Sequence, residues 1–236
     1  MLDCVSLDFF WGGCTISEAH YRDFDGAEMF TQLRKRIAGE VPNIGFWLPS
    51  GFDCYMRVLY PFVGESTSDL APWREVAHVR GIGFRPDLTL EEMESAARLD
   101  TKFGGWYPNS GPLQHNYLSH VIECLCPSSQ RNSLRMLVGF YSHRYNAAEL
   151  ALGGPEVSIM ENSQLRVNVL TLLEFRALPD SPDFLCSLDL DWCVLSISDD
   201  VGESFICCNG DAGLALVGSE KIECVEIDFD SFKVTV

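Results

Sequence analysis

Residues 45–62 read GFWLPSGFDCYMRVLYPF, and only two charged side chains interrupt this apolar run. Between residues 53 and 60 one set of alternate positions is wholly apolar, whereas the other set includes Arg57. A period of two is typical of a β-strand that buries one face. We therefore expect a half-buried strand in the interior of a sheet, with Met56 and Val58 in the core and Arg57 on the opposite face.

Prolines mark the limits of this strand and the start of a later helix. Pro49 and Pro61 bracket the strand, because proline has no N–H for a ladder and holds the preceding residue extended. Pro72 suits the first turn of a helix. Thr89 and Glu92 have the spacing of a capping box, which predicts another helix start. Further helices are expected over 26–39, where Gly39 ends the helix, and over 113–125, where Pro127 prevents its continuation.

The sequence changes character after residue 127. It then contains apolar, often alternating segments separated by Gly, Asn, Asp and Pro, which predict strands at 134–141, 156–161, 165–175, 191–198, 205–208 and 222–229. One helix, at 212–217, is expected among them. This order predicts an α+β fold with a mostly antiparallel sheet and with helices concentrated in the N-terminal half. We expect residues 1–236 to form a single domain, with 177–182 as the candidate subdomain break.

Composition restricts the class of protein. The chain has 236 residues, of which 47% are hydrophobic, enough to fill a core. No apolar run approaches the roughly 20 residues that a membrane-spanning helix needs, so we expect no membrane insertion. The ten cysteines lie scattered in apolar segments, as buried thiols do, and the first residues lack the basic start of an export signal. These features predict a reducing, cytoplasmic location with all ten cysteines reduced.

Negative charge is concentrated near the end of the chain. The formal net charge is −17, and the residues from Leu178 onward account for −11 of it. A field of this sign repels phosphate backbones, which disfavours nucleic acid as a partner and favours a basic protein.

Five acidic residues in this region are the candidate partner-binding site. Asp189 and Asp191 precede the strand that starts at Trp192, whereas Asp199, Asp200 and Glu203 crowd the turn that follows it. Clustered carboxylates can bind a divalent cation, act as an acid and base pair, attract a cationic protein, or keep a domain soluble. The spacing of a calcium loop with its central glycine is not met. Two interpretations stay open ahead of metal binding and catalysis: a solvated face that only keeps the domain soluble, and a surface that binds a basic partner.

Other constellations in the sequence favour ordinary structure over chemistry. His120 and Glu123 share one face of the expected helix, and His115 or His143 could complete a metal site. However, a zinc site usually has two close ligand pairs, and a spacing of five rotates His115 away from His120. Cysteine pairs 124/126 and 207/208 lack a matching second pair. No nucleophile elbow or phosphate-binding loop occurs, so we expect no catalytic residue, no metal and no cofactor.

Several short motifs occur along the chain: LPSGFDxYxRVLxP at 48–61, WxEVA at 73–77, then Trp106, Pro108, Gly111 and Leu113, then SPD at 181–183 and DWCV at 191–194. In order and spacing these motifs resemble a group of bacterial proteins, common in actinobacteria, to which no activity is assigned. The resemblance covers most of the chain and implies a single bacterial cytosolic unit, but it transfers no catalytic residue. Arg85-Pro86 stands where members of the group often have His-Pro.

Two classes of function follow from these features. The first is a non-catalytic binding protein, for example an immunity-type inhibitor that masks a cationic toxin. It is favoured by the small size, the strong acidity and the lack of a catalytic signature. The alternative is an enzyme, such as a hydrolase, with an unrecognised site. A stoichiometric basic partner would support the first class, whereas a bound small molecule or metal would support the second.

Overall fold

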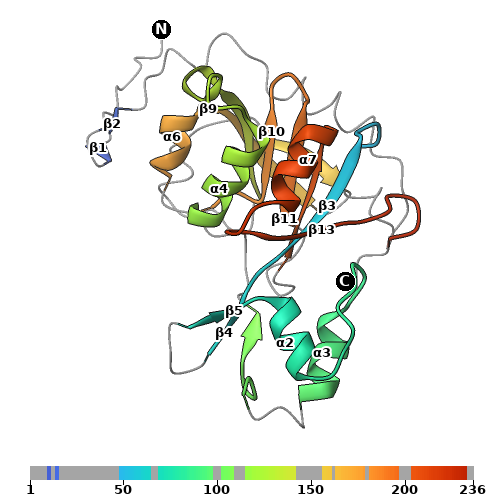
Figure 1. Ribbon diagram of the computed structural model, residues 1–236. Coiled ribbons are helices and arrows are strands. Elements are labelled where there is room, and N and C mark those ends of the chain that lie inside the picture. Colours follow the sequence, from blue (N-terminus) through green and yellow to red (C-terminus); the bar gives the residue numbers. More distant parts are fainter. Residues whose placement is uncertain are drawn as a thin grey trace, which may run out of the picture.

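An eight-stranded antiparallel sheet forms the centre of the fold (Figure 1). The computed structural model describes residues 10–11, 14–15, 48–64, 69–97, 102–108, 115–141, 156–160, 163–178, 181–196 and 203–232. The strand order is β13-β3-β12-β11-β10-β7-β9-β8. The strands are β3 (Cys54–Leu59), β7 (Arg135–Tyr141), β8 (Glu156–Met160), β9 (Ser163–Thr171), β10 (Phe184–Ser187), β11 (Trp192–Ser196), β12 (Glu203–Cys208) and β13 (Glu223–Glu226). This architecture confirms the predicted α+β class with an antiparallel sheet.

Strand β3 is the predicted interior strand, and it pairs with β12 on one side and β13 on the other. Met56 and Val58 are each 1% exposed, as expected. Arg57 does lie on the opposite face, but it is only 4% exposed, so the expectation of a half-buried strand was wrong. Its guanidinium donates hydrogen bonds to the carbonyls of Pro86 and Leu88, and it lies over the Trp73 ring. Carbonyl oxygens and an aromatic face thus let a charged residue occupy a covered surface.

Three helices cover one face of the main sheet: α4 (His115–Leu125), α6 (Leu172–Arg176) and α7 (Gly210–Val217) (Figure 1). Their apolar side chains form one core cluster with Met56 and Val58 of β3. The other face holds a second cluster, in which Phe205 of β12 packs with Ile227 and the rings that follow β13. Each face of β3 is therefore covered by a different part of the chain.

A smaller lobe is inserted between β3 and α4 (Figure 1). It contains a three-stranded sheet of order β5-β4-β6, with β4 (Phe62–Val63), β5 (Leu70–Ala71) and β6 (Tyr107–Pro108), and the helices α2 (Trp73–Val79) and α3 (Leu90–Ala96). Trp73 and Phe62 are buried in its core, which also includes Leu59 and Val225 of the main sheet. The lobe and the main sheet thus share a hydrophobic contact.

The predicted starts of the two helices in this lobe are confirmed. Pro72 precedes α2, and Gly81 follows it with a φ of +72°. The Thr89 hydroxyl accepts the Glu92 N–H, while the Glu92 carboxylate accepts the Thr89 N–H, which is the predicted capping box. A two-stranded ribbon of β1 (Phe10–Trp11) and β2 (Cys14–Thr15) and a short 3-10 helix, η4 (Arg131–Ser133), complete the described elements.

The second half departs from the predicted strands at two places. The strand expected over 165–175 ends at Thr171, because Thr171 and Glu174 form a second capping box that starts α6. Strand β10 was not predicted. With α6 and α7 present, the described helices lie in both halves of the chain. The helix expected at 26–39 lies outside the described residues, and the break near 177–182 stays a prediction.

Free cysteines and short helices characterise the described residues. Eight cysteines are free, namely Cys54, Cys124, Cys126, Cys186, Cys193, Cys207, Cys208 and Cys224. Cys4 and the side chain of Cys14 lie outside the described part. Among the helices that the structure describes, none is long and apolar enough to cross a membrane.

Candidate functional site

Two of the predicted partner-binding residues lie on the tight turn between β10 and β11. Asp189 and Asp191 are both exposed. Leu190 between them has a φ of +58°, an unusual conformation for a residue with a side chain. The Ser187 hydroxyl accepts the N–H of Asp191 at 2.8 Å, and Leu190 packs against the apolar cluster on one face of the sheet. Packing of the leucine and this hydrogen bond hold the turn so that the two carboxylates reach solvent.

The other predicted residues are not brought to this turn. Asp199 and Asp200 lie outside the described residues. Glu203 is the first residue of β12, paired with Leu59, and only its backbone is described. Because β11 and β12 are antiparallel, Glu203 at the start of β12 and Asp191 before β11 lie at different ends of the sheet. The five residues of β11 separate the two ends by about 16 Å, at about 3.3 Å per residue.

The strand register instead gathers other carboxylates beside Asp189 and Asp191. Trp192 pairs with Cys208, and Cys208 pairs with Cys54. The turn before β11, the end of β12 and the start of β3 therefore lie at the same end of the sheet. Ile227, which follows β13, donates its N–H to the Tyr55 carbonyl at this end. We call it the acidic end and define it by six exposed residues: Asp53, Asp189, Asp191, Asp211, Glu226 and Asp228.

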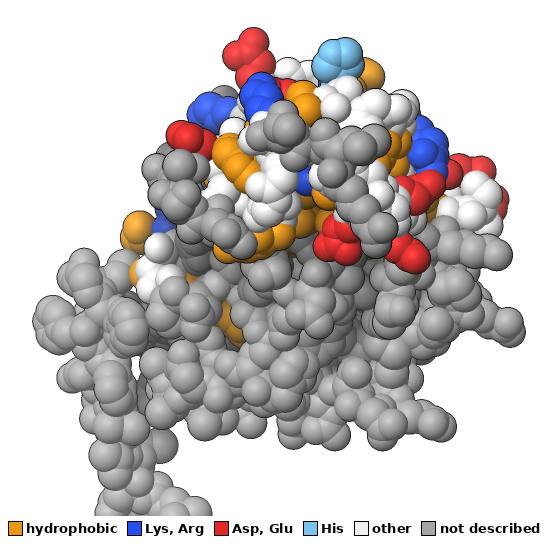
Figure 2. Space-filling view, turned by 90° about the horizontal axis from the view of Figure 1, so that it is seen from below, with side chains coloured by type: hydrophobic (Ala, Val, Ile, Leu, Met, Phe, Trp, Pro, Cys, Tyr) orange, Lys and Arg blue, Asp and Glu red, His pale blue; other side chains and the backbone are white. Residues whose placement is uncertain are grey.

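The acidic end has one sign of charge. The chain segments that meet there, 52–54, 187–192, 208–211 and 226–228, contain no lysine or arginine. Arg135 lies next to these segments, because it precedes Met136 of β7, which pairs with Ser187. On the described part of the face seen from below, by contrast, basic, acidic and apolar side chains are interleaved (Figure 2). Among the described residues, the four segments of the acidic end thus differ in charge from the face in Figure 2.

Buried thiols beneath the acidic end respond to its carboxylates. Burial raises the pKa of Cys208 to about 12, with further increases from neighbouring thiols and from Asp53 and Glu226. Burial, followed by Glu226 and Asp53, also raises the pKa of Cys54. The pKa of Asp228 is lowered by hydrogen bonds from the Ser231 hydroxyl and the Asp230 N–H, so Asp228 stays ionised. Carboxylates from the start of β3 and the end of β13 thus act on the same small region.

Sequence reasoning missed four members of the acidic end. Asp53 lies far from Asp211, Glu226 and Asp228 in the chain, and only the pairing of β3 with β12 and β13 brings it to them. One signal was present in the sequence: Asp53 and Asp211 each lie at the start of a predicted strand or helix, and Asp228 lies next to the end of the strand predicted over 222–229. Glu226, by contrast, lies inside that predicted strand.

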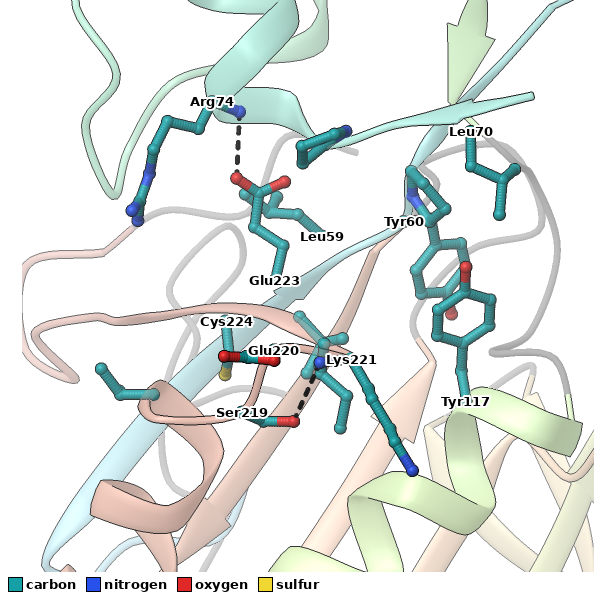
Figure 3. Close-up of a pocket in the computed structure, with 15 residues that line it drawn as sticks. Leu59, Tyr60, Leu70, Arg74, Tyr117, Ser219, Glu220, Lys221, Glu223 and Cys224 are labelled. Atoms are coloured by element: carbon teal, nitrogen blue, oxygen red, sulfur yellow. Dashed lines mark hydrogen bonds between the residues drawn. The ribbon is translucent and has the colours of Figure 1, made fainter.

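A pocket of about 360 Å³ lies at the other end of β13, where the two lobes meet (Figure 3). It is lined by residues of β3, β5, α2, α4 and the turn between α7 and β13. Leu70 and Val217, 54% and 56% exposed, contribute apolar surface to it. The polar groups include Tyr117, Lys221 and Glu223. The pocket therefore offers a mixed lining with both signs of charge.

Glu223 in this pocket has a structural role. Its carboxylate accepts the backbone N–H of Arg74 at 2.9 Å (Figure 3). It also accepts the backbone N–H of Trp73 at 2.5 Å, so both bonds lie at the first turn of α2. Burial raises the pKa of Glu223, and these N–H groups and Arg74 oppose the rise. The same carboxylate thus joins β13 of the main sheet to α2 of the small lobe.

A neighbouring depression of about 340 Å³ contains His120, Glu123 and Cys124 of α4. Nδ1 of His120 lies 3.4 Å from Oε2 of Glu123, and this hydrogen bond is the main reason that the pKa of Glu123 is lowered. Burial raises the pKa of Cys124, so its thiol stays protonated at neutral pH. Within the described ranges, no three His, Cys, Asp or Glu side chains are placed to hold a metal ion. The His115 side chain and His143 lie outside these ranges.

Comparison with protein-family models, with curated proteins and with solved structures gives no match. The resemblance to the actinobacterial group therefore stays a prediction. Functional assignment for this chain rests on its own residues.

Proposed function

We propose that this chain is a non-catalytic binding protein that docks a basic protein against the acidic end. One observation carries the proposal: six exposed carboxylates from separate parts of the chain meet at one end of the sheet, in segments without lysine or arginine. An inhibitor that masks a cationic toxin, as immunity proteins do, is one form of this function.

The grouping of these carboxylates is the important feature, more than their number. A net charge of about 2 to 8 in magnitude already keeps a small domain soluble, and the chain carries −17. Solubility does not require like charges to adjoin, and their mutual repulsion opposes folding. A grouped field of one sign does accelerate encounter with a partner of the opposite sign. Partner recognition therefore accounts for the grouping better than solubility does.

The proposed location is a reducing bacterial cytoplasm. Eight free cysteines support it, because a chain with many thiols near one another would be prone to oxidation in an oxidising compartment. Cys186 and Cys193 illustrate this, with their sulfur atoms 2.9 Å apart in a buried cross-strand pair.

The proposal is tested with a variant that neutralises the exposed turn, Asp189→Asn/Asp191→Asn. Its matched control is Glu91→Gln/Glu94→Gln, which removes two exposed charges from α3 in the small lobe. Wild type is used to capture a partner from native lysate at low salt, and association kinetics are then measured for all three proteins. We expect a stoichiometric basic partner whose association rate falls with ionic strength and in the turn variant, but not in the control. Unchanged kinetics in the turn variant, or a captured partner without net positive charge, would contradict the proposal.

An enzyme, such as a hydrolase, is the second candidate. The observation in its favour is the hydrogen bond between His120 and Glu123, which lie in one depression with Cys124. A carboxylate, an imidazole base and a thiol are the groups of a nucleophilic site. It ranks second because burial keeps the Cys124 thiol protonated. A time course with p-nitrophenyl acetate tests it: an initial burst in wild type that is lost in Cys124→Ser but kept in Cys126→Ser would favour the enzyme.

A further inference from the structure

Strand β13 is an edge of the main sheet, and its outer side faces away from every strand that the structure describes. Ile227 donates its N–H to the Tyr55 carbonyl across the β13 and β3 ladder. In an antiparallel pair, hydrogen-bonded residues alternate with residues whose backbone groups point away. Val225 and Glu223 therefore share the orientation of Ile227, whereas the N–H and C=O groups of Cys224 and Glu226 point outward.

An edge that no described strand pairs with can be a template for another strand. Unpaired N–H and C=O groups in a row can add a strand from a partner, and natural proteins often block such edges with charge, proline or a covering segment. Charge is the feature present here, because Glu226 is exposed on β13 and Asp228 follows it. Negative charge repels a second copy of the same edge, which carries the same carboxylates, and favours a basic strand.

The two ends of β13 offer different chemistry. Its last residues reach the acidic end, through Glu226 and Asp228. Its first residues, Glu223 and Cys224, line the pocket at the lobe junction, together with the exposed apolar side chains of Leu70 and Val217. A strand laid along β13 would thus meet carboxylates at one end and a partly apolar pocket at the other.

We propose that β13 binds the basic partner by strand addition, accepting an extended segment that alternates basic and apolar residues. This inference rests on the proposed function and specifies its contact. A lysine or arginine lies opposite Glu226, with its own N–H and C=O bonded to the outward groups of Glu226. An apolar side chain of the same segment lies opposite Glu223, next to the pocket that Glu223 lines.

The pairing predicts which peptide nitrogens matter. A residue opposite Glu226 forms a hydrogen-bonded pair, so its N–H faces β13, whereas the N–H groups of its two neighbours face solvent. In a segment that alternates lysine and valine, charge attraction to Glu226 places the lysines in the hydrogen-bonded positions. Methylation of the lysine backbone nitrogens therefore blocks pairing, and methylation of the valine nitrogens does not.

The experiment uses the full chain and three synthetic peptides of alternating lysine and valine, starting and ending with lysine. One is unmodified, one is methylated on the lysine backbone nitrogens, and one on the valine backbone nitrogens. All three carry the same charge. Affinity is measured by titration at low salt, and hydrogen exchange is followed at the amides of Cys224 and Glu226. We expect lysine N-methylation to weaken binding at least tenfold, valine N-methylation to change it less than threefold, and the unmodified peptide to slow exchange of both amides.

Other outcomes separate the failure of this inference from the failure of the proposed function. If all three peptides bind equally and exchange at Cys224 and Glu226 is unchanged, strand addition is wrong, although a basic partner still binds the acidic end. If no peptide binds at low salt, strand addition is again wrong. The proposed function is then judged separately, by the capture of a basic partner and its association kinetics. Protection of the amides by an alternating glutamate and valine peptide would show that the edge pairs without regard to charge, which overturns the basic specificity.

A variant of the protein supplies a second readout. Glu226→Lys keeps the backbone of β13 but reverses the charge that selects the segment, and Glu220→Lys makes the same change at an exposed residue before the strand. We expect Glu226→Lys to weaken binding of the unmodified peptide at least tenfold, and Glu220→Lys to weaken it less. Equal effects of the two variants would mean that the peptide is attracted by the net charge of the protein and not by Glu226. That result would overturn the proposed strand register.

Discussion

The carboxylate of Glu223 accepts the backbone N–H of Trp73, which lies 150 residues earlier in the chain. This contact links the last strand of the main sheet to the first helix of the small lobe. Glu223 is only partly exposed at the lobe junction, and its partial burial raises the pKa of its carboxyl. Stability at this junction should therefore depend on pH.

Acidification should stabilise wild type relative to Glu223→Gln. A raised pKa means that the folded state binds the Glu223 proton more tightly than the unfolded chain, whose ordinary value is 4.5. The stability linked to this proton is fully present below the unfolded pKa and is lost as the pH rises through the folded pKa. Glutamine is neutral at every pH and lacks this component. Urea midpoints measured between pH 7 and pH 4.5 check the difference, with Glu220→Gln correcting for the loss of one charge. A difference between wild type and Glu223→Gln that does not vary with pH would refute the prediction.

Val58→Asp should unfold the protein. Val58 is 1% exposed within the core cluster beneath α4 and α7, so an aspartate there would be a buried charge without a counter-ion. Such a change costs several kcal/mol, comparable to the stability of a whole domain. Leu214→Asp is the control, because Leu214 is 74% exposed on α7. Circular dichroism melting should show a lost transition for Val58→Asp and a nearly unchanged one for the control. Cooperative melting of Val58→Asp near the wild-type temperature would show that the core position is misassigned.

Gly213→Ala should destabilise the protein although alanine favours helices. A Cβ at Gly213 of α7 would lie 2.9 Å from Sγ and 3.1 Å from Cβ of Cys54 on β3, closer than normal contact. Overpacking of this kind costs about 1 to 3 kcal/mol, more than the gain of about 1 kcal/mol in helix propensity. Cys54→Ala removes the sulfur and should recover part of the loss in the double variant. Chemical denaturation of the two single variants and the double variant measures this coupling. Additive effects would mean that α7 does not approach β3 this closely.

Cysteine alkylation should follow burial. At pH 8, Cys208, with a pKa of about 12, has roughly a thousandfold less thiolate than a thiol at the ordinary value of 9.0. Cys54 and Cys124 are partly exposed and should react with iodoacetamide first, although burial also raises the pKa of each. Peptide mapping by mass spectrometry before and after denaturant gives the order. Early labelling of Cys208 in the native protein would contradict the packing of α7 on β3.

Local signals in the sequence predicted some elements well because their causes are local. The alternation around Val58, Pro72 before α2 and the capping box of Thr89 each act within a few residues. The same capping signal at Thr171 and Glu174 was overlooked, because it follows a long run of strand-forming residues in β9. A search for Thr-x-x-Glu inside predicted strands would have found α6.

Long-range pairing accounts for what the sequence did not predict. Arg57 was expected at a more open face, but the insertion that carries Pro86 and Leu88 covers it. The acidic end depends on the register of five strands, so Asp53 and Glu226 could not be placed together from their positions in the chain. Glu223 was not recognised as a junction residue, because its partner Trp73 is remote in sequence.

The pairing of β3 has a consequence for synthesis. Both hydrogen-bonding sides of β3 are satisfied only by β12 and β13, and the Tyr60 hydroxyl shares a hydrogen bond with Ser204, 144 residues further along. At a translation rate of about 5 to 20 residues per second, the ribosome needs about 7 to 30 s to make that stretch. During this interval one of the most apolar strands of the protein has emerged without either partner. A cell that makes this protein has to keep nascent β3 from aggregating until the C-terminal strands arrive.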